Sequence, residues 1–80
     1  MKLQKAVGIR IGELLAKFNI SRYALCKKIC LIEQTLKHII DEGNKDIKLK
    51  TIALIADGFD MSIEEFFADE IFNKNNLEIE

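Results

Sequence analysis

The sequence predicts one small all-α domain built from a bundle of five helices. About half of the 80 residues are hydrophobic (49%), and alanine and long aliphatic side chains dominate among them. Pro is absent and only four Gly occur, so few residues interrupt a helix or favour a sheet. A chain of this length can form one thin core and not two. We therefore expect a single bundle of short helices.

Apolar residues recur at helical spacing in the first half of the chain. A first helix is predicted over residues 3–18, where Val7, Ile11 and Leu14 share one face. Ser21 is a suitable N-cap for a second helix over residues 22–29. A third helix is expected over residues 32–41, ending before a polar loop that contains Gly43.

The second half of the chain predicts two further helices. One runs over residues 49–58. Ser62 with Glu65 three residues later forms the pattern of a capping box, which predicts a fifth helix that continues to Ile71 and Phe72. The expected organisation is one domain over residues 1–72, followed by a polar tail over 73–80 in which only Leu77 and Ile79 are apolar.

Charge is segregated along the chain, although the net charge is only -1. Residues 1–50 carry eleven Lys or Arg against five acids, whereas residues 51–80 carry one Lys against eight acids. A basic half joined to an acidic half favours a polyanionic partner and gives it an orientation. The alternative is two solvated surfaces of ordinary charge.

Residues 22–41 have the pattern of two short helices that cross at a tight turn. Leu25 and Ile29 share one helical face, Leu36 and Ile39 share another, and Leu31 lies between them. This pattern resembles the helix-turn-helix of the Cro/C1-type repressors, the XRE family. The resemblance extends over about residues 10–67. Its second part is similar to the ending of that family, in the segments Thr51-Ile52-Ala53-Leu54-Ile55-Ala56 and Ser62-Ile63-Glu64-Glu65-Phe66-Phe67.

The resemblance implies a lambda-repressor-like fold and a DNA-binding transcriptional regulator, expected to be a repressor, that inserts its third helix in the major groove. Double-stranded DNA is then the expected partner, with no cofactor and no small-molecule substrate. The residues implied to read bases are Glu33, Gln34, Thr35, Lys37 and His38. Those implied to hold phosphates are Arg22, Lys27, Lys28 and Lys45, with Lys48 and Lys50 adding to the field.

Several positions depart from the family pattern. Cys30 occupies a turn position that usually has Gly because it often needs a positive φ. Ile32 replaces the Ser or Thr that usually caps the recognition helix, Ile47 replaces a common Pro, and Glu33 places an acid near phosphates. These departures bear on affinity and specificity more than on the fold.

Metal binding and catalysis are weak alternatives. Cys26, Cys30 and His38 are too few for a closed zinc site and lack its usual spacing, so Cys26 is expected to be a small buried hydrophobe. The chain also shows no nucleophile motif and no phosphate-binding loop, so we expect no enzyme activity.

The main alternative is a protein-interaction module on the same fold, an antitoxin-like or regulatory partner that works through its acidic C-terminal third. We also expect a homodimer, because a two-fold protein reads a two-fold operator, with Ile71 and Phe72 as the seam. The sequence has no secretory signal pattern and no apolar run that could cross a membrane, which predicts a cytoplasmic protein.

Overall fold

The computed structural model describes residues 1–42 and 46–78, and the regular elements in that part of the chain are all helical. The all-α prediction is therefore confirmed. None of the described helices combines the length and apolar character that crossing a bilayer requires. In chain order the elements are α1 (Leu3–Lys17), α2 (Arg22–Ile29), α3 (Glu33–Lys37), η1 (His38–Glu42), α4 (Leu49–Gly58), α5 (Ile63–Phe67), η2 (Glu70–Phe72) and η3 (Lys74–Asn76).

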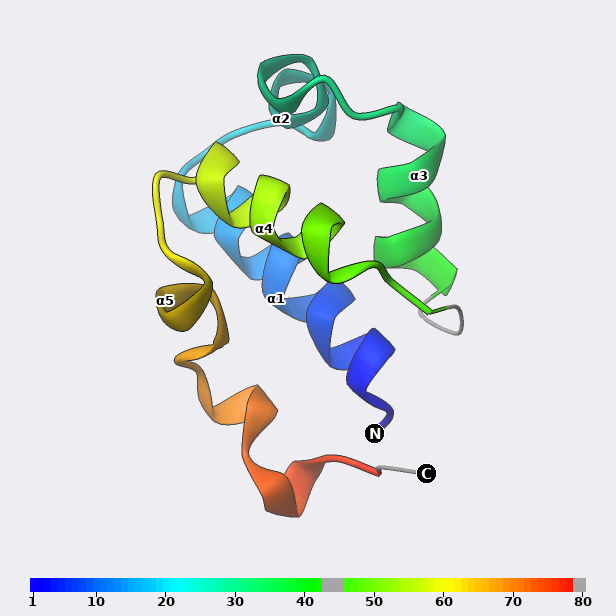
Figure 1. Ribbon diagram of the computed structural model, residues 1–80, viewed down its shortest axis with the longest axis vertical. Coiled ribbons are helices and arrows are strands. Elements are labelled where there is room, and N and C mark those ends of the chain that lie inside the picture. The colour runs from blue at the N-terminus through cyan, green and yellow to red at the C-terminus, as the bar shows by residue number, and fades with distance from the viewer. Residues whose placement is uncertain (43–45, 79–80) are drawn as a thin grey trace.

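α1 is the longest of the described helices, and both η1 and η2 pack against it. α2 packs against both α3 and α4, and α5 packs against α4. The core between them is apolar, and its largest fully buried side chains are Phe66, Ile11, Leu14, Leu25, Leu36, Ile55 and Val7. α2 and α3 lie toward one end of the molecule, while the C-terminal segment lies at the other (Figure 1).

Local capping signals begin two of the helices as the sequence predicts. The Ser21 hydroxyl accepts from the backbone N–H of Ala24 at 3.0 Å and caps α2. Ser62 and Glu65 form a reciprocal capping box at the start of α5, and these bonds lower the pKa of the Glu65 carboxyl. The bounds of α2 and α4 are those expected from the sequence.

The third helix differs from its prediction. Regular α-helix ends at Lys37, and residues His38–Glu42 form a π-helical turn. Here the chain approaches α1 closely, because a Cβ built on Gly8 would lie 2.6 Å from the Ile39 carbonyl oxygen. The wider turn allows Ile39 and the next residue, Ile40, both to pack against the core.

The fifth helix is shorter than predicted and ends at Phe67. Arg10 of α1 binds its last turn: Nε donates to the Phe66 carbonyl at 2.8 Å and Nη2 donates to the Glu65 carbonyl at 3.1 Å. Nη1 also pairs with Asp69 at 3.2 Å. These bonds satisfy carbonyls that the end of α5 leaves without helical partners, and the chain beyond them forms the separate 3₁₀ turn η2.

The tail packs more than its polar composition indicates. The amino group of Met1 donates to the Asn76 carbonyl at 2.8 Å, and the backbone N–H of Glu78 donates to the Met1 carbonyl at 2.7 Å. Leu77 is half-buried, while Ile79 lies outside the described residues. These bonds hold the segment that ends at Glu78 beside the start of α1 (Figure 1).

Candidate nucleic-acid interface

α2 and α3 are joined by a tight turn centred on Cys30. This residue has φ 55° and ψ 41°, so the left-handed conformation expected there is present although the residue is not Gly. The backbone N–H of Leu31 donates to the Cys26 carbonyl at 2.9 Å and closes the turn. Leu31 is half-buried against the core. The two helices are therefore held at an angle by a short, hydrogen-bonded connection.

α3 buries one side and presents the other. Leu36 is fully buried, whereas Glu33, Gln34 and Lys37 are exposed. The other two residues expected to read bases, Thr35 and His38, are half-buried. Ile32 precedes the helix without a side-chain cap and is 71% exposed. The prediction that the third helix has an outward polar face is thus correct for Glu33, Gln34 and Lys37.

Two hollows flank α3 in the described part of the chain. The first, of about 470 Å³, is lined by Arg22, Glu33, Gln34, Lys37 and His38. The second, of about 330 Å³, is lined by Thr35, His38, Ile39, Asp46, Ile47, Lys48 and Thr51. The fold therefore brings four of the five base-reading candidates together with Arg22 in one concave surface. Thr35 lies on the second hollow with Lys48.

The guanidinium of Arg22, in the first hollow, is paired with the carboxylate of Asp41. Its Nη2 donates to Asp41 Oδ1 at 2.8 Å and its Nη1 donates to Oδ2 at 3.1 Å. The hydrogen bond from Arg22 lowers the pKa of the Asp41 carboxyl, and the nearby charge of Lys37 adds to that effect. The same bond raises the pKa of Arg22. Because the Asp41 pKa is depressed, the pair stays charged at neutral pH and is lost only as the pH falls through that lowered value.

Asp41 is the residue of this surface that sequence reasoning missed. A signal was present, since Glu33, Lys37 and Asp41 recur at four-residue intervals and alternate in sign. Its partner Arg22, however, lies 19 residues away on another helix.

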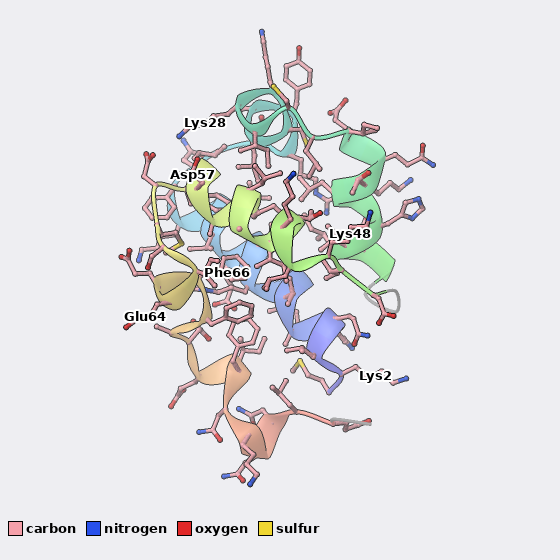
Figure 2. The ribbon with its side chains drawn as sticks, in the orientation of Figure 1. Lys2, Lys28, Lys48, Asp57, Glu64 and Phe66 are labelled. Atoms are coloured by element: carbon pink, nitrogen blue, oxygen red, sulfur yellow. The ribbon has the colours of Figure 1, made fainter. Side chains whose placement is uncertain are left out.

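The lysines expected to hold phosphates are distributed over different parts of the surface. Lys28 Nζ donates to the Gly58 carbonyl at 2.9 Å and lies 3.6 Å from Asp60 Oδ2. It therefore lies at the C-terminal end of α4, well separated from Lys48 beside α3 (Figure 2). Lys27 is exposed on α2, and Lys45 lies outside the described residues.

The two cysteines occupy different environments. Cys26 is buried, as expected for a small hydrophobe, and burial raises the pKa of its thiol, with the charge of Glu33 adding to the rise. Cys30 is exposed. Across the described residues, no three His, Cys, Asp or Glu side chains gather in a way that could hold a metal ion.

We expect the thiols of Cys26 and Cys30 to differ sharply in reactivity. A thiol reagent such as iodoacetamide should label Cys30 in the folded protein, whereas Cys26 should react only after unfolding, because the thiolate is the reactive form and burial disfavours it. Mass spectrometry of peptides from folded and urea-unfolded protein measures this difference. Equal labelling of both residues in the folded state would contradict the packing of Cys26.

Comparison with protein family models, with curated proteins and with solved structures finds no match to this chain. Its function is therefore inferred from the residues of α2, α3 and the surfaces around them.

Proposed function

We propose that this protein is a sequence-specific DNA-binding regulator, most simply a repressor, with a lambda-repressor-like arrangement that inserts α3 in the major groove. The observation that carries the proposal is the exposed polar face of α3, where Glu33, Gln34 and Lys37 share one hollow with Arg22. A major groove is wide enough to take an α-helix and displays a distinct pattern of donors and acceptors for each base pair. The short turn at Cys30 supports this role, because it lets α3 project beside α2.

The side chains on this face have the chemistry that base recognition uses. The Gln34 amide can both donate to and accept from adenine, and the Lys37 ammonium can donate to the acceptors of guanine. The Glu33 carboxylate can accept from the cytosine amino group. Thr35 and His38, which are half-buried, would contact bases only from the edge of the helix.

Phosphate contacts would lie on both sides of α3. Arg22 is the first residue of α2, so its guanidinium and the backbone N–H groups of that helix start can meet the same strand of DNA. Lys48, beside the second hollow, would meet the duplex from the other side. Lys28 is not part of this surface in our proposal, because it is bound to the end of α4.

We further propose that two copies bind one two-fold site. The dimer seam expected at Ile71 and Phe72 is partly covered by other residues of the same chain. The centroid of the Phe72 ring lies 4.8 Å from the centroid of the Phe67 ring and 6.2 Å from that of the Phe66 ring. Both seam residues are half-buried, which leaves part of each side chain for a partner. Binding to a palindromic site should then saturate at two chains per duplex.

The test of the proposed function is a fluorescence-anisotropy titration against random duplex and against sites selected from a random pool, at several salt concentrations. Gln34→Ala should weaken binding to the selected site about tenfold, because one bidentate base contact contributes roughly 1–3 kcal/mol of discrimination. It should leave binding to random duplex and the salt dependence unchanged, because Gln34 carries no charge. Asn75→Ala removes an exposed amide from the opposite end of the molecule and is the matched control.

The alternative function is a protein-interaction module, antitoxin-like or regulatory. Two observations favour it: Arg22 is already neutralised by Asp41, and the aromatic side chain of Tyr23 and the aliphatic side chain of Ile32 are 61% and 71% exposed beside the candidate surface. If both the wild-type protein and the variant Asp41→Asn, which frees Arg22, fail to bind any duplex at low salt, this alternative replaces the DNA-binding proposal.

A further inference from the structure

The charges around the first hollow cancel. Arg22 and Lys37 line it with two positive charges and Glu33 with one negative charge, and Asp41, which is bound to Arg22, adds a second negative charge. The basic excess of residues 1–50 is therefore not concentrated in this hollow. A neutral hollow gains little from releasing the counterions that surround DNA, and that release is the main source of affinity for phosphates.

The positive charge of Arg22 is neutralised directly, because Asp41 binds its guanidinium through two hydrogen bonds of 2.8 and 3.1 Å. The side chains of Arg22 and Asp41 are 45% and 42% exposed, so a phosphate could reach the guanidinium from solvent. Such a phosphate would bring its negative charge next to the Asp41 carboxylate. It would then have to displace that carboxylate or share the guanidinium with it.

The position of Asp41 depends on the π-helical turn. Asp41 belongs to η1, which packs on α1 at the close approach to Gly8, so the carboxylate is carried by an element anchored in the core. Its attraction also extends to Lys37, which lies on α3 in the same hollow. One carboxylate thus neutralises the arginine and weakens the field of the neighbouring lysine.

We propose that Asp41 is an intramolecular brake on DNA binding, which occupies Arg22 as a phosphate mimic and keeps the affinity of this surface low. The brake rests on the proposed function. If Asp41 is such a brake, DNA binding requires breaking or sharing the Arg22–Asp41 pair. The strength of that pair then sets the affinity for DNA and the dependence of that affinity on salt.

Asp41→Asn is the variant that tests the brake. We expect its dissociation constant for random duplex to fall about fivefold at 50 mM salt, and the slope of log K against log salt to steepen by about 0.9, the contribution of one more phosphate contact. The gain at 50 mM should therefore be about three to four times the gain at 200 mM. Fluorescence anisotropy measures both quantities, and circular dichroism confirms that the variant is folded. Asp41→Ser serves if Asp41→Asn does not fold.

Two further variants distinguish a brake from a general effect of net charge and from an orienting role of Asp41. Glu13→Gln removes the same charge from the exposed side of α1 and should change affinity less than twofold. The double variant Arg22→Gln/Asp41→Asn removes both members of the pair and should bind like the wild type, because a neutralised pair contributes no net attraction. If Asp41 instead orients Arg22 toward a phosphate, both Asp41→Asn and the double variant will bind more weakly than the wild type, which overturns the brake.

The outcomes also distinguish the brake from the proposed function. Duplex binding by the wild type with no tightening in Asp41→Asn, or with an equal gain in Glu13→Gln, removes the brake and leaves the DNA-binding proposal standing. Absence of duplex binding at 50 mM salt by the wild type and by Asp41→Asn removes both. A rank order in which Asp41→Asn binds most tightly, with the wild type and the double variant equal, supports both.

Discussion

Replacing Phe66 with Ala is expected to abolish cooperative folding at room temperature or to leave only a marginal fold. The Phe66 ring is fully buried where α5 meets the rest of the bundle (Figure 2) and packs edge-on against the Phe67 ring, with 5.2 Å between centroids. Truncating a buried Phe to Ala costs about 3–5 kcal/mol, which is close to the whole free energy of unfolding of so small a domain. Thermal unfolding followed by circular dichroism measures the effect. A variant that still folds should melt at least about 12 °C lower than the wild type.

Phe18→Ala is the matched control for Phe66→Ala. The Phe18 ring is 43% exposed and stacks on Phe59 with 6.0 Å between centroids, so its removal leaves no enclosed cavity. We expect it to lower the free energy of unfolding by about 1 kcal/mol. Equal losses in the two variants would show that α5 is not part of the cooperative core.

Adding one methyl group at Gly8 is expected to destabilise the protein, whereas the same change at Gly12 should stabilise it. The Cβ of Gly8→Ala would lie 2.6 Å from the Ile39 carbonyl oxygen and 3.2 Å from the Ile40 Cα, both backbone atoms that cannot rotate away. The contact forces α1 and η1 apart at a cost of about 1–3 kcal/mol. At Gly12, no atom of the described residues outside the neighbouring backbone of α1 lies within 4 Å of the added Cβ, so the gain in helix propensity should stabilise the protein by about 0.5–1 kcal/mol.

Urea unfolding of the two alanine variants gives the two changes in the free energy of unfolding under identical conditions. Both glycines lie in α1, so intrinsic helix propensity affects them alike and the difference between the variants reports the close approach alone. Stabilisation by both substitutions would mean that η1 does not rest on Gly8. Gly8→Ala should also alter duplex binding under our proposal, because η1 carries His38 and Asp41.

Much of the local structure could be predicted because its causes lie within a few residues. Ser21 caps α2 through Ala24, and Ser62 and Glu65 cap α5 through each other, so short sequence patterns were sufficient to place both helix starts. The left-handed turn at Cys30 and the burial of Cys26 were likewise expected and are confirmed. The lambda-repressor-like arrangement remains a proposal.

The candidate site could be predicted only in part. Helical periodicity correctly placed Glu33, Gln34 and Lys37 on an exposed face, because that face follows from which residues are apolar. Periodicity did not show that Thr35 and His38 are half-buried, because they line a hollow together with residues 46–48 and Thr51, which are distant in sequence. It also did not show that Lys28 is bound to the end of α4, a contact across 30 residues.

The sequence alone determined that this chain is helical, where two of its helices begin, which residues of α3 stay polar and exposed, and that basic and acidic residues are segregated along it. Each of these properties depends on composition or on neighbours within about one helical turn. Only the tertiary structure decided how α3 ends and which charges remain available. The π-helical turn lies where the backbone at Ile39 approaches Gly8, and the neutralisation of Arg22 comes from a pair 19 residues apart in sequence. Such contacts are set by packing between helices, which residue spacing does not encode.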